Sequence, residues 1–250
     1  MIKLSFIFLI LINSSVSFAT TFRICYESPH FFPYEEDGGS KQKLGPVIKL
    51  IKFAAQQAQL ETKFIRTSWA RCLEDAKHNN VDAVLTSLWT KEREKFLVFP
   101  RDLKGNIDPT KYLLKAKYKI YTHIDSKVEW DGLRIKNTIT GIGAPANYVA
   151  KDKLKDLQVL KETDLLVKQA FDLIIKKRLD GYVVLKDVGD IILKDYIDKS
   201  LIKELEKNFI EDNLYIPVSY GFFKKHPLKS KAFFNQLSKE RDKFYPRTLR

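Results

Sequence analysis

The sequence predicts a two-lobed α/β protein in which each lobe is a doubly wound, mostly parallel sheet. Strand and helix patterns alternate twice along the chain, which is the order typical of such sheets. Extended, alternating segments flank the second unit, at residues 112–124 and 213–225. An amphipathic helix pattern at residues 228–244 then remains without a partner in that unit. We therefore expect two chain crossings that form a hinge, with a ligand cleft between the lobes.

The first unit starts with an apolar, β-rich segment at residues 22–28. Its remaining patterns, in order, are a helix at 44–60, a strand at 62–67, a short helix at 69–80 and a buried strand at 81–88. Because the chain would return to this unit after the second crossing, lobe one is expected to be discontinuous. We predict residues 20–118 and 215–250 for lobe one, and 119–214 for lobe two.

The second unit repeats the alternation after Trp130. Residues 133–143 end in a strand pattern. Further on, Thr163 is a candidate N-cap for a strongly amphipathic helix. In order, the other patterns are a helix at 145–156, a strand at 157–162, that helix at 163–178 and a strand at 179–185. The unit therefore has the same construction as the first.

Residues 1–19 have the pattern of a cleaved signal peptide. One lysine precedes an apolar run from Leu4 to Ile12, and small residues follow at Ser17 and Ala19. The run is too short to span a bilayer, although an uncleaved anchor is the alternative interpretation. We therefore expect a soluble mature protein, periplasmic or secreted, that starts near Thr20.

The formal net charge of +13 raises the possibility of nucleic-acid binding. The lysines, however, are scattered at helical spacing opposite apolar positions, whereas nucleic-acid binders cluster basic and aromatic residues on one platform. The four histidines are far apart in sequence, and no CxxC pair is present. The glycine-rich stretch Gly141–Ala146 lacks the third glycine of a dinucleotide fingerprint. We expect no nucleic-acid partner, metal or cofactor.

Cys25 and Cys72 are the two cysteines of the chain. Right-handed crossovers would return the helix at residues 69–80 across the first strand, which brings the two cysteines together. An exported protein can keep a disulfide, so we predict a Cys25–Cys72 bridge. Two buried free thiols are the alternative.

A dense group of polar and aromatic residues follows the buried strand at 81–88. The stretch carries Thr86, Ser87, Trp89, Thr90 and Arg93 at the start of a predicted helix. A helix start favours an anion, and a guanidinium adds a bidentate contact to a carboxylate. The alternatives are a surface ion pair of the arginine with a neighbouring glutamate, and ordinary core packing for the tryptophans.

Several segments together resemble the extracellular solute-binding proteins of ABC transporters, in the amino-acid-type family. They are FFPYEE, LGPVIKLIKFAAQQ, SWARCLEDAKHNNVDAVLTSLWTKEREKFLVFP, WDGLRI, ITGIGAPA and KKRLDGYVVL. The resemblance spans nearly all of the mature chain and implies a periplasmic-binding-protein fold. It implies that Arg93 clamps a ligand carboxylate and that Phe31 and Trp69 stack on the ligand. It also implies a monomer that delivers a small molecule to an ABC permease or a membrane sensor.

The sequence departs from this family at two positions in the second unit. Leu185 stands where amino-acid binders have the aspartate that pairs with the ligand ammonium, and Asp187 is the nearest acid. Pro145 stands where they have a serine or threonine. Because a buried ammonium without a carboxylate is costly, we expect free α-amino acids to bind weakly. Asn147 and Tyr148 are candidate replacement contacts, with ordinary helix surface as their alternative.

The leading hypothesis is therefore an exported binding protein for a small polar, carboxylate-bearing ligand, and not an enzyme. An enzyme on the same scaffold, dehydratase-like or acting on cell-wall polymers, would need a cleft carboxylate with a raised pKa. Glu27 and Glu35 are the candidates for that role, and an ordinary polar residue at a strand end is the alternative interpretation of Glu27. A third possibility is an orphan protein that binds peptide or signals to a partner.

Overall fold

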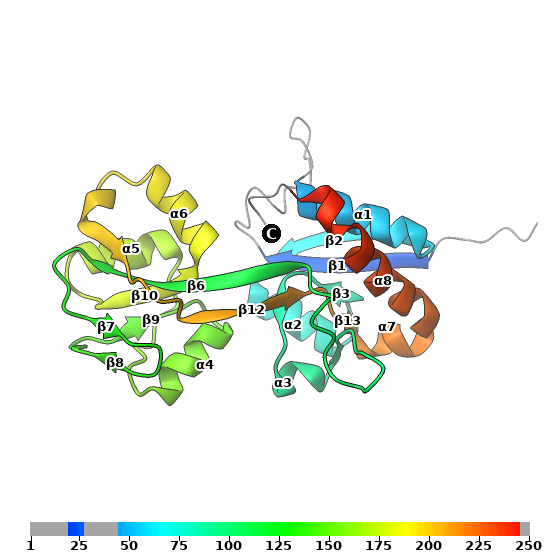
Figure 1. Cartoon of the computed structure of the whole chain (residues 1–250), viewed down its shortest axis with the longest axis horizontal. Coiled ribbons are helices and arrows are strands. Elements are labelled where there is room, and N and C mark those ends of the chain that lie inside the picture. The colour runs from blue at the N-terminus through cyan, green and yellow to red at the C-terminus, as the bar shows by residue number, and fades with distance from the viewer. Residues whose placement is uncertain (1–19, 28–44, 246–250) are drawn as a thin grey trace, which may run out of the picture.

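The computed structural model describes residues 20–27 and 45–245. These residues form two lobes joined by long strands, as Figure 1 shows. The predicted signal peptide, Phe31 and Glu35 lie outside the described residues. Among the helices of the described part, none is both long enough and apolar enough to cross a membrane.

The first lobe is built on a five-stranded sheet with the order β2-β1-β3-β13-β5. β1 runs parallel to β2 and β3, while β13 is antiparallel to its neighbours β3 and β5. The strands are β1 (Thr20–Glu27), β2 (Leu60–Thr67), β3 (Ala83–Val84), β5 (Leu97–Val98) and β13 (Val218–Ser219). The helices of this lobe are α1 (Pro46–Gln57), α2 (Trp69–Lys77), α3 (Lys91–Glu94), α7 (Tyr220–Lys225) and α8 (Pro227–Phe244).

Alternation along β1 directs its side chains to two different cores. Phe22, Ile24 and Tyr26 are buried in the cluster that also contains the apolar faces of α1 and α8. Cys25 points to the other face and is buried with Trp69 and Cys72 of α2. The helices therefore cover both faces of the sheet, and α8 packs on the first lobe as the sequence predicts.

The second lobe is built on a sheet with the order β4-β12-β6-β10-β9, in which β11 also pairs with β6. β9 and β10 are parallel, and the long β6 is antiparallel to β10, β11 and β12. These strands are β4 (Ser87–Leu88), β6 (Leu114–His123), β9 (Ile142–Gly143), β10 (Gly181–Leu185), β11 (Ile202–Glu204) and β12 (Ile210–Tyr215). The other elements are the hairpin β7 (Glu129–Trp130) and β8 (Ile135–Lys136), and the helices α4 (Val149–Asp156), α5 (Val167–Ile175), α6 (Lys186–Lys194) and η1 (Lys199–Leu201).

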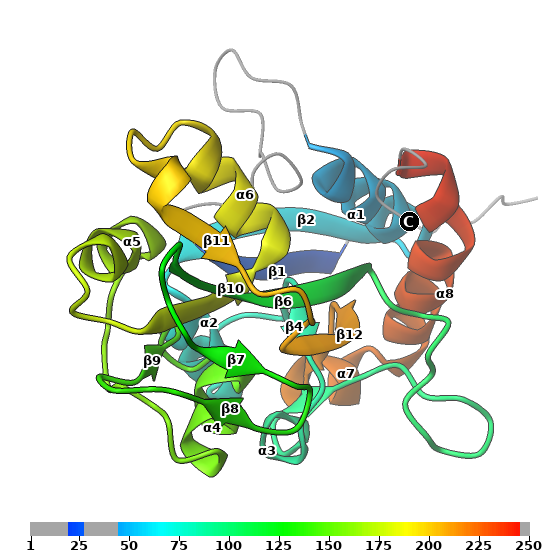
Figure 2. The same cartoon turned by 60° about the vertical axis from the view of Figure 1, so that its left-hand side comes forward.

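β6 and β12 are the two segments that join the lobes (Figures 1 and 2). Their antiparallel ladder runs from Ile210 opposite Tyr118 to Leu214 opposite Leu114. At its C-terminal end β12 pairs with β4, which is Ser87–Leu88. This sheet therefore reaches the strand that directly precedes the turn carrying Arg93. We propose lobe boundaries at residues 118/119 and 214/215, because these positions lie on this paired crossing.

Four expectations about single elements were wrong. The segment 213–225, expected to be extended, ends in the helix α7. The strand expected at residues 81–88 is split at Thr86, and its halves β3 and β4 belong to different sheets. Thr86 has a φ of 60°, a left-handed conformation that ends a strand and is unusual for a β-branched residue. Residues 157–162 form only an isolated bridge between Leu160 and Ile142. Leu166, rather than Thr163, is the N-cap of α5, and its amide donates to the Gln169 side chain.

The predicted disulfide joins Cys25 of β1 to Cys72 of α2, with a Cα–Cα distance of 5.5 Å. Both residues are fully buried, so the bridge ties the helix to the sheet inside the core. The sequence separation is 47 residues, a loop long enough for the constraint on the unfolded chain to be substantial.

We expect reduction of this bridge to lower the free energy of unfolding by about 2–4 kcal/mol. Urea unfolding of the oxidised protein, with and without a reductant, measures the difference. The Cys25→Ala/Cys72→Ala protein is the matched control and should not respond to the reductant. Two titratable thiols in the unfolded, unreduced protein would contradict the bridge.

Candidate functional site

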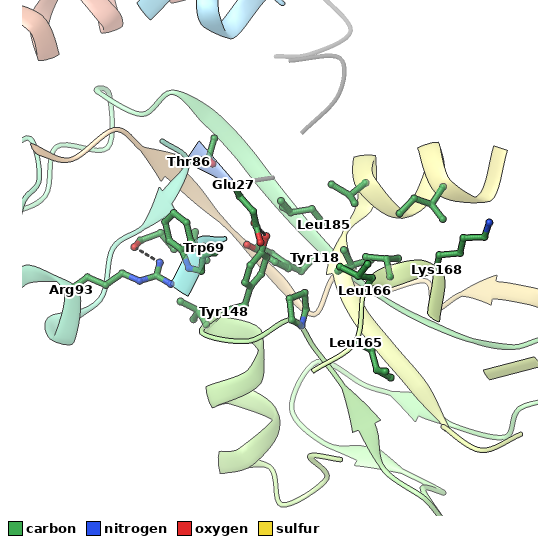
Figure 3. A pocket seen from close by; sticks show the side chains of 17 residues that line it. Glu27, Trp69, Thr86, Arg93, Tyr118, Tyr148, Leu165, Leu166, Lys168 and Leu185 are labelled. Atoms are coloured by element: carbon green, nitrogen blue, oxygen red, sulfur yellow. Dashed lines mark hydrogen bonds between the residues drawn. The ribbon is translucent and has the colours of Figure 1, made fainter. Parts of the chain in front are cut away.

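A cavity of about 360 Å³ lies between the two lobes (Figure 3). Lobe one contributes most of the polar and aromatic part of its wall, and lobe two contributes mainly aliphatic side chains, with Tyr148 and Lys168 as exceptions. The lining residues are Glu27, Trp69, Thr86, Leu88, Arg93, Tyr118, Pro145, Tyr148, Val149, Leu165, Leu166, Val167, Lys168, Val184, Leu185, Val188 and Ile192. The cavity volume is at the lower end of the range for small-molecule sites.

Arg93 is positioned by the turn that follows β4. Thr90 caps α3 by accepting a hydrogen bond from the Arg93 amide at 3.1 Å. The Arg93 side chain folds back on the strand, where Nη1 donates to the Leu88 carbonyl at 2.9 Å. Ser87 Oγ accepts a longer contact from the same nitrogen at 3.4 Å. The turn and the strand thus fix the direction of the guanidinium.

The guanidinium of Arg93 is buried without a carboxylate partner among the described residues. The residue is 8% exposed, and its guanidinium carbon lies 5.2 Å from the centre of the Trp69 ring. None of the ion pairs between described residues includes it, so its contacts are carbonyl and hydroxyl oxygens. Burial lowers the pKa of Arg93, although an arginine remains charged in proteins. An anion in the cavity would offset the desolvation of this charge.

The carbonyl of Asn147 links the lobes. It accepts a hydrogen bond from Arg93 Nη2 at 3.1 Å and another from Trp69 Nε1 at 3.2 Å. Asn147 has a φ of 60°, which asparagine adopts more readily than most residues. Two donors of lobe one therefore converge on one acceptor of lobe two, and the lobes are held closed over the cavity.

A second link between the lobes joins Glu27, at the end of β1, to Tyr148, at the N-cap of α4. The Tyr148 hydroxyl donates to Glu27 Oε2, and both residues line the cavity (Figure 3). The Tyr148 ring also lies edge-on to Trp69 and Tyr118. Burial raises the pKa of Glu27, and the hydrogen bond from Tyr148 only partly opposes this effect.

The structure brings together Trp69, Thr86, Arg93 and Tyr148 in the cavity wall, as the sequence suggests. Asn147 contributes its backbone carbonyl rather than its side chain to the contacts just described. Phe31 lies outside the described residues.

Four predicted ligand contacts, Ser87, Trp89, Thr90 and Asn147, are not among the residues that line the cavity. Ser87 is fully buried behind Arg93, and its hydroxyl donates to the Leu88 carbonyl at 3.0 Å. Trp89 packs against the core around the disulfide, and the Thr90 hydroxyl is used as the cap of α3. α3 has only four residues, so the expected help from a helix dipole is also absent at this turn. Ser87 and Thr90 therefore support Arg93 through hydrogen bonds, and Trp89 belongs to the core.

Sequence reasoning missed most of the second wall. It missed Leu165, Leu166 and Val167, on the loop before α5 and its first residue, and in lobe one it missed Tyr118 of β6. In the wall of lobe two, the sequence pointed only to Tyr148, Pro145 and Leu185. The last two stand where the family that the sequence resembles has polar residues. Asp187, the acid nearest to Leu185 in sequence, is not part of the cavity wall. In the described part of the chain, no three metal-ligating side chains are grouped to hold an ion.

Glu27→Gln should make the protein more stable than wild type, and the difference between the two should grow as the pH rises. The raised pKa means that folded Glu27 retains its proton at pH values where the unfolded chain has lost it, so folding becomes less favourable from about pH 4.3 upward. The gain in melting temperature over wild type should be small at pH 4 and grow toward pH 8. Glu61→Gln removes a charge from an exposed position of β2 and is the control. Parallel pH profiles for the Glu27 variant and wild type would contradict the burial effect.

A comparison of the sequence with protein families gave no match, and a comparison with curated proteins gave none either. Solved structures are similar. A histidine kinase sensor domain with similarity to periplasmic binding proteins has a TM-score of 0.68 at 15% identity, over 90% of this chain and 96% of that one. The substrate-binding protein of an amino acid ABC transporter has 0.66 at 20% identity, over the same shares. An ancestral amino-acid-binding protein, a precursor of cyclohexadienyl dehydratase, has 0.64 at 18% identity, over 92% and 95%. This chain has the two-lobed α/β fold of periplasmic binding proteins.

Proposed function

We propose that this protein is an exported solute-binding protein that closes on a small, carboxylate-bearing ligand. The observation that carries the proposal is the buried guanidinium of Arg93, which faces an interlobe cavity without an acidic partner among the described residues. Keeping such a charge out of water is costly unless a counter-charge arrives. A ligand carboxylate supplies that charge and accepts two parallel hydrogen bonds.

Ligand binding would be coupled to lobe closure. Arg93 and Trp69 reach across the cavity to the Asn147 carbonyl, and Tyr148 reaches back to Glu27. A ligand carboxylate that accepts a hydrogen bond from Arg93 would alter the contacts that Arg93 makes between the lobes. Ligand binding and the closed arrangement of the lobes therefore depend on each other. This coupling is what an uptake protein or a sensor needs in order to report that it is loaded. We propose an ABC permease or a membrane sensor as the partner, with the protein acting as a monomer.

The fold similarities support this proposal. One similar structure is the substrate-binding protein of an amino acid ABC transporter, and another is a sensor domain of a histidine kinase. The candidate signal peptide at residues 1–19 supports export to the periplasm or the medium.

A second function is favoured by Glu27. A buried carboxyl with a raised pKa, hydrogen-bonded to a tyrosine in a ligand cavity, has the properties of a general acid. One similar structure is an ancestral binding protein described as a precursor of a dehydratase. Enzymatic activity would appear as new signals in the NMR spectrum of a bound ligand incubated with the protein. Glu27→Gln should abolish these signals and keep binding, and an unchanged ligand would exclude catalysis on it.

Arg93→Ala should weaken binding of a carboxylate ligand by roughly 30-fold or more, because the lost contact is a desolvated, charge-assisted pair worth about 2–5 kcal/mol. A thermal-shift screen of amino acids, monocarboxylates, dicarboxylates, sugars and polyamines identifies the ligand, and calorimetry measures the affinity. Arg93→Lys should recover only part of it, since an ammonium lacks the planar fork.

Arg71→Ala is the matched control for this measurement. It removes the same charge from α2, where Arg71 is exposed and forms an ion pair with Asp75. Its affinity should equal that of wild type. If Arg93→Ala also binds the ligand as wild type does, the site lies elsewhere.

A further inference from the structure

The two halves of the cavity differ in chemistry. The charged and hydroxyl groups of the described wall, apart from Lys168 and Tyr148, come from lobe one. Lys168 lies at the end opposite Arg93 in Figure 3. The rest of the lobe-two wall is apolar and consists of Pro145, Val149, Leu165, Leu166, Val167, Val184, Leu185, Val188 and Ile192. A ligand held by Arg93 would therefore extend into an aliphatic environment.

The aliphatic surface is built by a regular helix face. Leu185 is the N-cap of α6, and Val188 and Ile192 follow at spacings of three and four residues, which place side chains on one side of a helix. β10 delivers Leu185 to the cavity after a run of five buried residues, Gly181–Leu185. The apolar character is therefore a property of two packed elements, not of one exposed side chain.

The one acid in the described wall is already engaged. Glu27 accepts a hydrogen bond from Tyr148, and this contact is also one of the links between the lobes. Burial favours the neutral form of the carboxyl, because it raises the pKa. A ligand ammonium near Glu27 would need the charged form and would compete with Tyr148. The lobe-two wall offers no carboxylate in its place.

We infer that the ligand is a monocarboxylate with an aliphatic or aromatic body and no α-ammonium group. This inference rests on the proposed function, since Arg93 must hold the carboxylate. The body would fill the apolar half, where each buried methylene strengthens binding by about fourfold. An α-ammonium would instead be desolvated without a free carboxylate partner, which is costly.

Matched ligand pairs test this inference directly. Calorimetry would compare 4-methylpentanoate with leucine, and 3-phenylpropanoate with phenylalanine, because each pair differs only by the α-ammonium group. We expect each carboxylate to bind at least tenfold more tightly than its amino acid. The neutral 4-methylpentanamide should bind at least tenfold more weakly than the acid, because it cannot neutralise Arg93.

Leu185→Asp tests the same point by reversal. The substitution places a carboxylate in the apolar wall, and aspartate is a favoured N-cap residue, so α6 should be retained. We expect this variant to bind leucine more tightly than wild type does and 4-methylpentanoate more weakly. Leu185→Asn is the control, since it has the same shape and capping ability without the charge, and it should not gain leucine binding.

The outcomes separate this inference from the proposed function. Tighter binding of leucine than of 4-methylpentanoate to wild type, lost in Arg93→Ala, would overturn the inference and leave the carboxylate site intact. If neither 4-methylpentanoate nor 3-phenylpropanoate binds at millimolar concentration, the inference is also overturned. Binding of a different carboxylate in the thermal-shift screen would then still support the proposed function. A best ligand without any anionic group would overturn both.

Discussion

The contact between the Arg93 guanidinium and the Asn147 carbonyl is the interaction on which the site depends. The Leu88 carbonyl anchors Arg93 to lobe one, and Asn147 lies just before α4 of lobe two. The 3.1 Å hydrogen bond from Arg93 to the Asn147 carbonyl therefore spans the cleft. Trp69 adds a second donor to the same oxygen and covers the guanidinium with its ring. The charge that would attract an anion is thus also a charge that holds the lobes together.

The geometry of this contact is created by a break in a strand. Thr86 adopts a left-handed conformation between β3 and β4, and its hydroxyl donates to the Leu85 carbonyl at 2.7 Å. β3 stays in the sheet of lobe one, while β4 pairs with β12, which crosses between the lobes. The turn that carries Arg93 therefore starts where the two sheets meet. A continuous strand would keep Leu88 and the guanidinium in the sheet of lobe one.

The cavity combines a polar end and an apolar end because its two walls come from separate folding units. Lobe one supplies Glu27, at the last ladder position of β1, and Thr86, which lies between β3 and β4. Lobe two supplies the last residue of β10 and one face of α6, which are apolar because they pack against the cores of the protein. The Glu27–Tyr148 hydrogen bond lies between these two environments and connects them.

The sequence by itself determined the alternation of strands and helices in two units and the return of α8 to the first lobe, and it predicted the bridge between Cys25 and Cys72. Hydrophobic periodicity and crossover handedness encode these features locally. It also made Arg93 a candidate, through the polar turn after a strand end together with the family resemblance, and the ligand-binding role of Arg93 stays a prediction. Only the tertiary structure decided which neighbours of Arg93 face the cavity and which support it. The contacts that matter join residues 54 to 121 positions apart, such as Arg93 to Asn147 and Glu27 to Tyr148. No local pattern specifies such pairs, since they form only when the two lobes close on each other.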